Sequence, residues 1–120
     1  HMGSMKEINF YRSESGKSPV EEFLDDLTAK QAKKVVWVLN LVEEHINVPS
    51  KYFKKMVNTG NLWEVRVNLG SNIFRILCFF DGSEIIILTH AFQKKTQKTP
   101  RQAIKIAEKR MKDYFKRKKL

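Results

Sequence analysis

The spacing of hydrophobic residues changes along the chain, and each change predicts a different element of secondary structure. Apolar and polar residues alternate from Glu7 to Arg12, which is typical of a short strand. The spacing then becomes helical and predicts a short helix after residue 18, followed by a long helix that ends before Pro49. The long helix is expected to bury the residues that keep this spacing: Ala32, Val35, Val36, Leu39, Val42 and Ile46.

Three polar segments have the residue types that begin a helix. In a capping box, a Ser or Thr side chain and a Glu or Gln three residues later each bond the other's backbone N–H group. Ser18–Glu21, Thr28–Gln31 and Thr99–Gln102 fit this pattern, and Pro19 and Pro100 are expected at the first helical position. The third box opens a final helix with an apolar stripe of Ile104, Ala107, Met111 and Tyr114.

The middle of the chain has the spacing of β-strands. After a basic connector at residues 51–59, alternating segments predict strands over Leu62–Asn68, Ile73–Phe80 and Glu84–Phe92. Gly70-Ser71 suits a type II′ hairpin turn and Asp81-Gly82 a type I′ turn. The order β-α-α-β-β-β-α predicts an α+β fold in which a small, mainly antiparallel sheet packs against helices.

The first predicted hairpin brings two arginines together. If Gly70-Ser71 is a two-residue loop, Arg66 lies directly opposite Arg75, and Glu64 lies opposite Leu77. Like charges in such cross-strand positions repel each other. One interpretation gives each arginine a carboxylate, for which Glu64 is the available group. The other is a phosphate site, because the guanidinium fork matches two phosphate oxygens.

The second hairpin determines where His90 points. A two-residue Asp81-Gly82 loop places Arg75 opposite Leu88 and His90 on the face of the arginines, whereas a three-residue loop turns His90 inward. On the arginine face, Leu77, Phe79 and Ile86 make the far end apolar. The opposite face is expected to be the core face, with Trp63, Val65, Val67, Phe74, Ile76, Cys78, Phe80, Ile85, Ile87 and Ala91.

The connection from the last strand to the last helix carries further candidates. It contains Lys94, Lys95 and Lys98 and ends at a helix N-terminus, which attracts anions through its free N–H groups. Beside the arginine pair, this connection is a plausible cradle for a phosphodiester. His90 suits a general acid or base at neutral pH, and a hydrogen-bonded structural histidine is the alternative.

Charge and composition narrow the class of protein. The chain has 120 residues and a net charge of +10; residues 1–93 hold 11 Lys and Arg against 11 Asp and Glu, so the excess lies in residues 94–120. Such a block indicates an anionic partner, of which nucleic acid is the commonest and an acidic protein segment or a membrane surface comes next. The alternative is a helix face that is simply solvated. Residues 1–4 resemble a tag remnant, and residues 5–120 are expected to form one domain.

Other chemistries find little support in the sequence. A single cysteine, Cys78, excludes an internal disulfide and a cysteine metal site. The histidines do not cluster and no glycine-rich phosphate loop is present, so neither a metal nor a cofactor is expected. No signal peptide or apolar run of membrane length occurs, so a cytoplasmic protein without membrane contact is expected.

Several segments resemble one known family. They are Phe10–Leu24, Leu62–Val67, Phe74–Leu77 and, most specifically, the string from His90 to Pro100. The chain resembles the HigB-type, phage-derived branch of the RelE/ParE toxin superfamily. The resemblance implies the toxin of a type II toxin–antitoxin pair, which enters the ribosome and cuts messenger RNA without a metal, using the ribose 2′-hydroxyl as nucleophile. It also implies a HigA-like helix-turn-helix antitoxin as partner.

The resemblance also assigns residues. Arg75 matches the sheet arginine that contacts the scissile phosphate, and Arg66 matches a basic partner on the next strand. Lys94 and Lys95, with His90, complete the candidate catalytic set. Contacts to messenger or ribosomal RNA are assigned to the remaining basic candidates: Lys98, Lys54, Lys55, Arg101, Lys105 and Lys109.

Two departures from the RelE pattern leave the proton-transfer residues open. Glu64 stands where RelE-like members have a second basic residue, and Tyr114 lies too far along to match their late catalytic tyrosine. Two other functions also stay open at this point: inhibition of DNA gyrase by a ParE-like toxin, and RNA binding without catalysis.

Overall fold

The computed structural model describes residues 5–96 and 98–119. The tag assignment at residues 1–4 and Gln97 of the lysine-rich connection therefore lie outside the described residues. The strands are β1 (Glu7–Phe10), β2 (Phe53–Lys55), β3 (Trp63–Leu69), β4 (Asn72–Asp81) and β5 (Ile85–Gln93), and the helices are α1 (Pro19–Asp25), α2 (Ala29–Glu44) and α3 (Arg101–Lys118).

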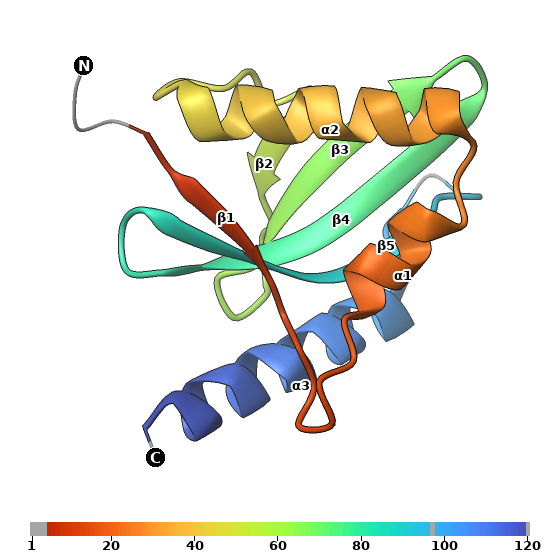
Figure 1. Ribbon diagram of the computed structural model, residues 1–120. Coiled ribbons are helices and arrows are strands. Elements are labelled where there is room, and N and C mark those ends of the chain that lie inside the picture. Colours follow the sequence, from red (N-terminus) through yellow and green to blue (C-terminus); the bar gives the residue numbers. More distant parts are fainter. Residues whose placement is uncertain (1–4, 97, 120) are drawn as a thin grey trace.

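The strands form one mixed five-stranded sheet in the order β1-β5-β4-β3-β2. All neighbours pair antiparallel except β1, which runs parallel to β5. The helices lie on both sides of this sheet, with α2 along one face and α3 along the other (Figure 1). The predicted α+β class is confirmed. The sequence missed β2, because three residues inside a lysine-rich connector are too few to display an alternation.

The first core lies between the sheet and the helices α1 and α2. Val35, Val38, Leu39 and Val42 are buried along α2, where they follow the i, i+3, i+4, i+7 spacing. The prediction that Val36 and Ile46 are also buried there was wrong, because their exposed fractions are 50% and 69%. Val36 lies outside that stripe, and Ile46 lies beyond the end of α2 at Glu44.

A second core lies on the opposite face, under α3. Ala103 and Ala107 are buried against Leu77, Phe79 and Ile87 of the sheet. The small alanine side chains let α3 approach the sheet closely. The sequence analysis placed Ile85 and Ile87 in the core on the α2 side, and this was wrong, because both pack under α3. Ile86 and Leu88 occupy the α2 side instead. The sheet therefore has two apolar faces, one of which also carries the charged residues described below.

The register of the two hairpins explains why Ile85 and Ile87 face the opposite side of the sheet from the one predicted. The first hairpin is as predicted, with Leu69 paired to Asn72, Arg66 to Arg75 and Glu64 to Leu77, and with Gly70 at a φ of 59° as its type II′ turn requires.

The second hairpin differs from its prediction, because Asp81 pairs with Ile85 across a three-residue loop and Arg75 pairs with Phe92 rather than Leu88. A bulge at Thr89 then shifts the register again. The longer loop reverses which residues at the start of β5 face α3, and the bulge reverses this again for the end of the strand. His90 therefore lies on the predicted face, where it pairs with Leu77.

The three predicted helix caps have different outcomes. Thr28 and Gln31 form the full capping box at the start of α2. Ser18 is the N-cap of α1 and Pro19 its first residue, as predicted, but the buried Ser18 hydroxyl makes no capping bond. The third box was wrong: Pro100 is the N-cap of α3, and the Thr99 hydroxyl donates instead to a carboxylate, a charged and therefore stronger acceptor.

Two carboxylates attach α3 to the rest of the domain. Tyr114 Oη donates to Asp81 Oδ2 at 2.6 Å, and Lys118 Nζ lies 2.7 Å from Asp81 Oδ1. Beside the middle of β5, Tyr11 Oη donates to Asp113 Oδ2 at 2.5 Å, and Arg117 donates to the same oxygen. These bonds join α3 to the end of β4 and to the segment after β1.

Acid should weaken this attachment, and Asp81→Asn should reduce the effect. Hydrogen bonds from Lys118 and then Tyr114 hold the pKa of Asp81 below its usual value of 3.8. A carboxylate with a depressed pKa stabilises the fold above its unfolded value, and the contribution is lost as the pH falls through the folded value. The urea midpoint should therefore fall less in Asp81→Asn than in the wild type between about pH 5 and about pH 2.

Asp25→Asn, an exposed position at the end of α1, is the matched control and should behave as the wild type. An equal acid-induced loss in Asp81→Asn and the wild type contradicts the role given to Asp81.

Candidate functional site

A polar cavity of about 620 Å³ opens next to the β3–β4 turn. Arg66 comes from β3, Arg75 from β4, and Lys94 and Lys95 follow directly after β5. Ser71, Ile73 and Thr96 complete the lining. Four of the five predicted catalytic residues therefore surround one hollow, although they come from three separate segments of the chain.

The two arginines share one carboxylate. Glu64 Oε1 lies 3.6 Å from Nε of Arg66 and 3.8 Å from Nε of Arg75. Both distances exceed the length of a hydrogen bond, so the contacts are electrostatic. Glu64 is itself 7% exposed, and its other oxygen accepts a 2.7 Å bond from the Thr99 hydroxyl. One buried carboxylate thus offsets one of two opposed positive charges, and Thr99 fixes its orientation.

Arg75 is the most deeply placed charge of the cavity. Its side chain is nearly inaccessible, and its Nη1 donates to the carbonyl of Phe74 at 3.0 Å. Burial, and then the neighbouring Arg66, lower the pKa of Arg75, while Glu64 opposes the shift. Among the described residues, no acceptor bonds the buried Nε atoms of Arg66 and Arg75. Unpaired buried donors are costly, which gives an anion that supplies acceptors a strong advantage.

Lys94 is held at the rim of the same cavity. Its backbone N–H donates to the carbonyl of Ile73 at 2.7 Å, which continues the β4–β5 pairing one residue beyond β5. Its side chain is partly buried, and burial, followed by the charge of Arg75, lowers the pKa of the Lys94 ammonium. A lysine whose pKa moves toward neutrality is better suited to proton transfer than an ordinary surface lysine.

His90 lies apart from these residues. It lines a different hollow with Tyr11, Lys17 and Arg110, where Arg110 Nη1 approaches His90 Nδ1 to 3.5 Å. Burial, and then the charge of Arg110, lower the pKa of His90 to about 4. The imidazole is therefore neutral at pH 7 and stacks on Phe92 at 5.6 Å between ring centroids. The structural alternative for this histidine fits its surroundings better than the acid–base role.

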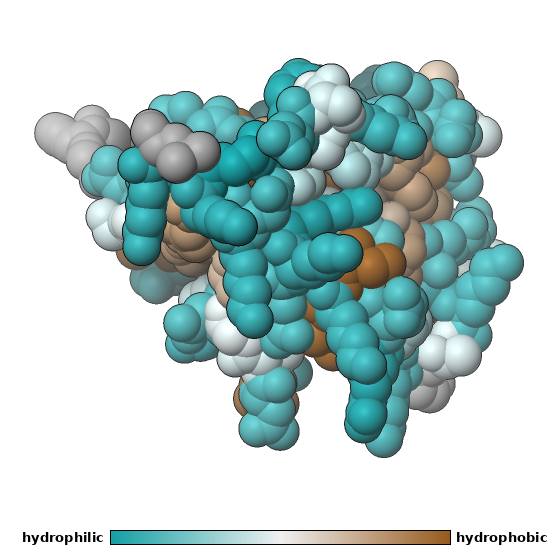
Figure 2. All heavy atoms as spheres, turned by 90° about the horizontal axis from the view of Figure 1, so that it is seen from below, coloured by the Kyte–Doolittle hydropathy of each residue, from teal (hydrophilic) through white to brown (hydrophobic). Residues whose placement is uncertain are grey.

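The residues predicted to bind RNA are exposed but spread over the surface. Lys98 follows the cavity rim without lining it, Arg101 begins α3, and Lys54 lies opposite Glu64 on β2. Lys105 and Lys109 line a shallow hollow along α3, and Lys55 lines a larger one. Seen from the α3 side, the surface is largely hydrophilic, with long polar side chains around small hydrophobic patches (Figure 2).

Sequence reasoning missed two contacts at the site. Thr99 was interpreted as a helix cap, and nothing in the local pattern indicated that its hydroxyl bonds Glu64 instead. Arg110 was one of many basic residues on the last helix, and its 2.7 Å bond to the Thr89 carbonyl beside His90 depends on the bulge in β5.

The cavity is suited to an anion rather than a metal ion. Within residues 5–96 and 98–119, no three His, Cys, Asp or Glu side chains form a group that holds a metal. Cationic side chains outnumber the single carboxylate around the cavity, and the arginine donors converge from two adjacent strands. Across the same described residues, none of the helices has the length and apolar character required to span a bilayer.

Comparison with known proteins identifies the family. Residues 22–112 match the family described as Phage derived protein Gp49-like (DUF891). The chain belongs to the Gp49-like family. This is a RelE/HigB-like toxin family, whose members are commonly toxins of toxin–antitoxin pairs. The Gp49-like match covers every residue that lines the cavity, from Arg66 to Thr96, and most of α3. A search among curated proteins found no match.

The position of Arg110 predicts how His90 titrates in this Gp49-like protein. The His90 imidazole should titrate near pH 4 by NMR, and Arg110→Gln should raise its pKa toward the ordinary value of 6.5, because a nearby positive charge is removed. Lys17→Gln, in the same hollow, is the control for a general loss of charge. A wild-type midpoint near 6.5 contradicts the assignment of His90 as a buried neutral residue.

Proposed function

We propose that the protein is a toxin that cuts messenger RNA on the ribosome. The observation that carries this proposal is the pair of opposed arginines, Arg66 and Arg75, which meet Lys94 around one polar cavity. Membership of a toxin family is consistent with it. The opposed pair is unfavourable for folding, and a phosphate that bridges the two guanidinium groups turns that repulsion into a binding contribution.

The proposed reaction is an internal transesterification of the RNA backbone. The ribose 2′-oxygen forms a bond to the adjacent phosphorus, and the bond from phosphorus to the 5′-oxygen of the next nucleotide breaks. The 2′-hydroxyl loses its proton to a base, and the departing 5′-oxygen receives one from an acid. A 2′,3′-cyclic phosphate and a 5′-hydroxyl result. Negative charge grows on the non-bridging oxygens, and preorganised cations stabilise it.

The cavity residues have distinct proposed roles. Arg75 and Arg66 hold the non-bridging oxygens, and Glu64 keeps both guanidinium groups in position. Lys94, with its lowered pKa, protonates the departing oxygen, and Lys95 holds a neighbouring phosphate. His90 takes no part in the chemical step in this assignment, since it is neutral and lines another hollow.

The partners follow from the charge distribution. Lys54, Arg101, Lys105 and Lys109 are exposed, and we assign them to ribosomal RNA, where each phosphate contact adds to affinity and to salt dependence. Lys98, next to the cavity, is assigned to the messenger itself. Neutralisation by an antitoxin and action in the cytoplasm belong to the same proposal, which the family supports only in its general outline.

Arg75→Met should separate function from stability. The methionine fills the space of the arginine stem but removes the charge, so ribosome-dependent cleavage, measured by primer extension, should fall by at least about a hundredfold. The variant should unfold at the same temperature as the wild type or higher, because it no longer buries a charge beside Arg66. Arg12→Met, in an exposed ion pair with Glu21, is the matched control and should cleave normally.

Unchanged cleavage by Arg75→Met overturns the role of this arginine. Two further results decide between functions. Loss of DNA supercoiling with intact messages supports a gyrase inhibitor, and RNA binding without any cut product supports a binding module.

Lys94→Arg should distinguish charge from proton transfer. Arginine keeps a positive charge at the cavity rim but stays protonated at all accessible pH values. RNA affinity should therefore be nearly unchanged, while the cleavage rate should fall by about a hundredfold. Lys95→Arg, the exposed neighbour, should retain the rate. Equal rates for Lys94→Arg and the wild type assign proton transfer to another group.

A further inference from the structure

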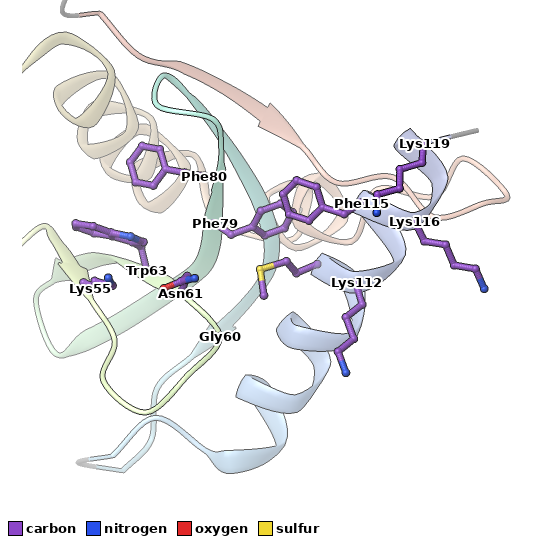
Figure 3. A pocket seen from close by; sticks show the side chains of 11 residues that line it. Lys55, Gly60, Asn61, Trp63, Phe79, Phe80, Lys112, Phe115, Lys116 and Lys119 are labelled. Carbon is purple, nitrogen blue, oxygen red and sulfur yellow. The ribbon is translucent and has the colours of Figure 1, made fainter.

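The hollow lined by Lys55, of about 800 Å³, lies between α3 and the segment that joins β2 to β3 (Figure 3). It shares no lining residue with the arginine cavity. Its apolar floor combines Phe79, Met111 and Phe115 of the core under α3 with Trp63 and Phe80, which pack on the α2-side core. We call this hollow the α3 groove. None of the proposed catalytic residues lies in it, so the proposed reaction leaves it without a role.

The floor of the α3 groove is supported from behind by aromatic packing. Phe79 and Phe115 lie 5.4 Å apart between ring centroids, and Trp63 lies 5.5 Å from Phe80. Trp63 also stacks on Phe53 at 4.7 Å with an angle of 22° between the rings. These contacts fix the rings in place, so the groove is preformed and an occupant need not reorganise it.

The rim of the α3 groove is positively charged. Lys55 lies on one side, and Lys112 and Lys116 of α3, with Lys119 just after the helix, lie on the other (Figure 3). All four are exposed, and no acidic residue is among the residues that line the groove. Within the described part of the chain, no carboxylate forms an ion pair with any of the four. An apolar floor between unpaired cations is complementary to a ligand with the opposite pattern.

This pattern fits a protein helix better than RNA. Bases bind proteins by stacking on exposed aromatic faces, but Trp63 already stacks on Phe53, and Phe79 is only 1% exposed. Aliphatic side chains can instead pack against the partly exposed surfaces of Trp63, Phe80, Met111 and Phe115, without access to a whole ring face. We propose that the α3 groove binds an acidic amphipathic helix of a partner protein, with apolar residues at helical spacing on the floor and carboxylates at the lysines.

The chemistry of this occupant is inferred from the groove alone. Its source as the antitoxin rests on the proposed function, because a toxin of this class has a dedicated partner protein. The two inferences are separable, since Arg75 contributes to one and the lysines of the rim to the other.

Trp63 offers a direct measure of binding. Trp37, the other tryptophan, is 49% exposed on α2 and can be replaced in a Trp37→Phe background, which leaves Trp63 as the single reporter. The probe is a synthetic peptide of about 18 residues with leucines at helical spacing and glutamates on its other face. It should change the Trp63 emission saturably, and a scrambled peptide of the same composition should not.

Charge reversal then tests the rim. Lys112→Glu with Lys116→Glu should weaken peptide binding by at least about tenfold. The matched control, Lys30→Glu with Lys33→Glu on exposed positions of α2, changes the net charge equally and should leave binding unchanged. Met111→Gln, with circular dichroism to verify folding, should also weaken binding because the floor becomes polar.

Three results overturn the proposal: equal binding of the scrambled peptide, equal loss in the α2 control, or a Lys112- and Lys116-dependent response to single-stranded RNA but not to the peptide. Arg75→Met should bind the peptide as the wild type does. If the wild-type protein binds the peptide but cuts no message, the proposed function is rejected and the groove is retained. If the wild-type protein cuts messages but does not bind the peptide, the groove alone is rejected.

Discussion

The central constraint on this structure is the repulsion between two arginines that the β3–β4 hairpin places directly opposite each other. The surrounding residues have to accommodate this repulsion. The two-residue turn at Gly70 fixes the register of the hairpin, and this register pairs Arg66 with Arg75. Glu64 lies within 4 Å of both guanidinium groups and relieves part of the repulsion. A sheet selected only for stability would place an uncharged residue at one of these positions. The cost is consistent with a site that is completed by an anion.

The two-sided sheet makes room for this site. The face that carries Arg66 and Arg75 becomes apolar further along, where Leu77, Phe79 and Ile87 pack under α3. The transition requires β5 to present Ile87 on this face and still return His90 and Phe92 to it, and the bulge at Thr89 makes both possible. Thr99, immediately before α3, bonds Glu64, so the start of the helix is tied to the charged part of the face. Site and core are therefore positioned by the same strands.

Local patterns predicted those parts of the structure that depend on local interactions. The helices α2 and α3, the capping box at Thr28 and the turn at Gly70 each depend on residues close in sequence, and each was predicted, although Val36 and Ile46 were wrongly expected to be buried. The opposed arginines followed from the turn. Two local predictions failed, the two-residue loop at Asp81-Gly82 and the capping box at Thr99. The bulge at Thr89 is a different error, because it reflects packing on both faces at once and no alternation in one strand reveals it.

The site shows the same limit. Sequence reasoning grouped His90 with Lys94 because they are near in the chain, whereas Arg110, twenty residues later, determines the surroundings of His90. The bond from Thr99 to Glu64 spans 35 residues and replaced an expected cap. Proximity of charges in sequence was a reliable guide only where a turn of known length connected them.

The two proposed surfaces have a consequence for inhibition. The arginine cavity lies beside Thr96 and the start of α3, whereas the α3 groove involves Met111 to Lys119, in the second half of the helix. An occupant of the groove therefore leaves the lining of the cavity untouched and covers lysines instead. Lys55 on the rim of the groove is also a predicted RNA contact, so we expect such a partner to inhibit by hindering docking on RNA, while the reactive residues stay accessible in the complex. Both competing interactions are then electrostatic, so each weakens as salt rises, and the balance between the two affinities determines how strongly the partner inhibits.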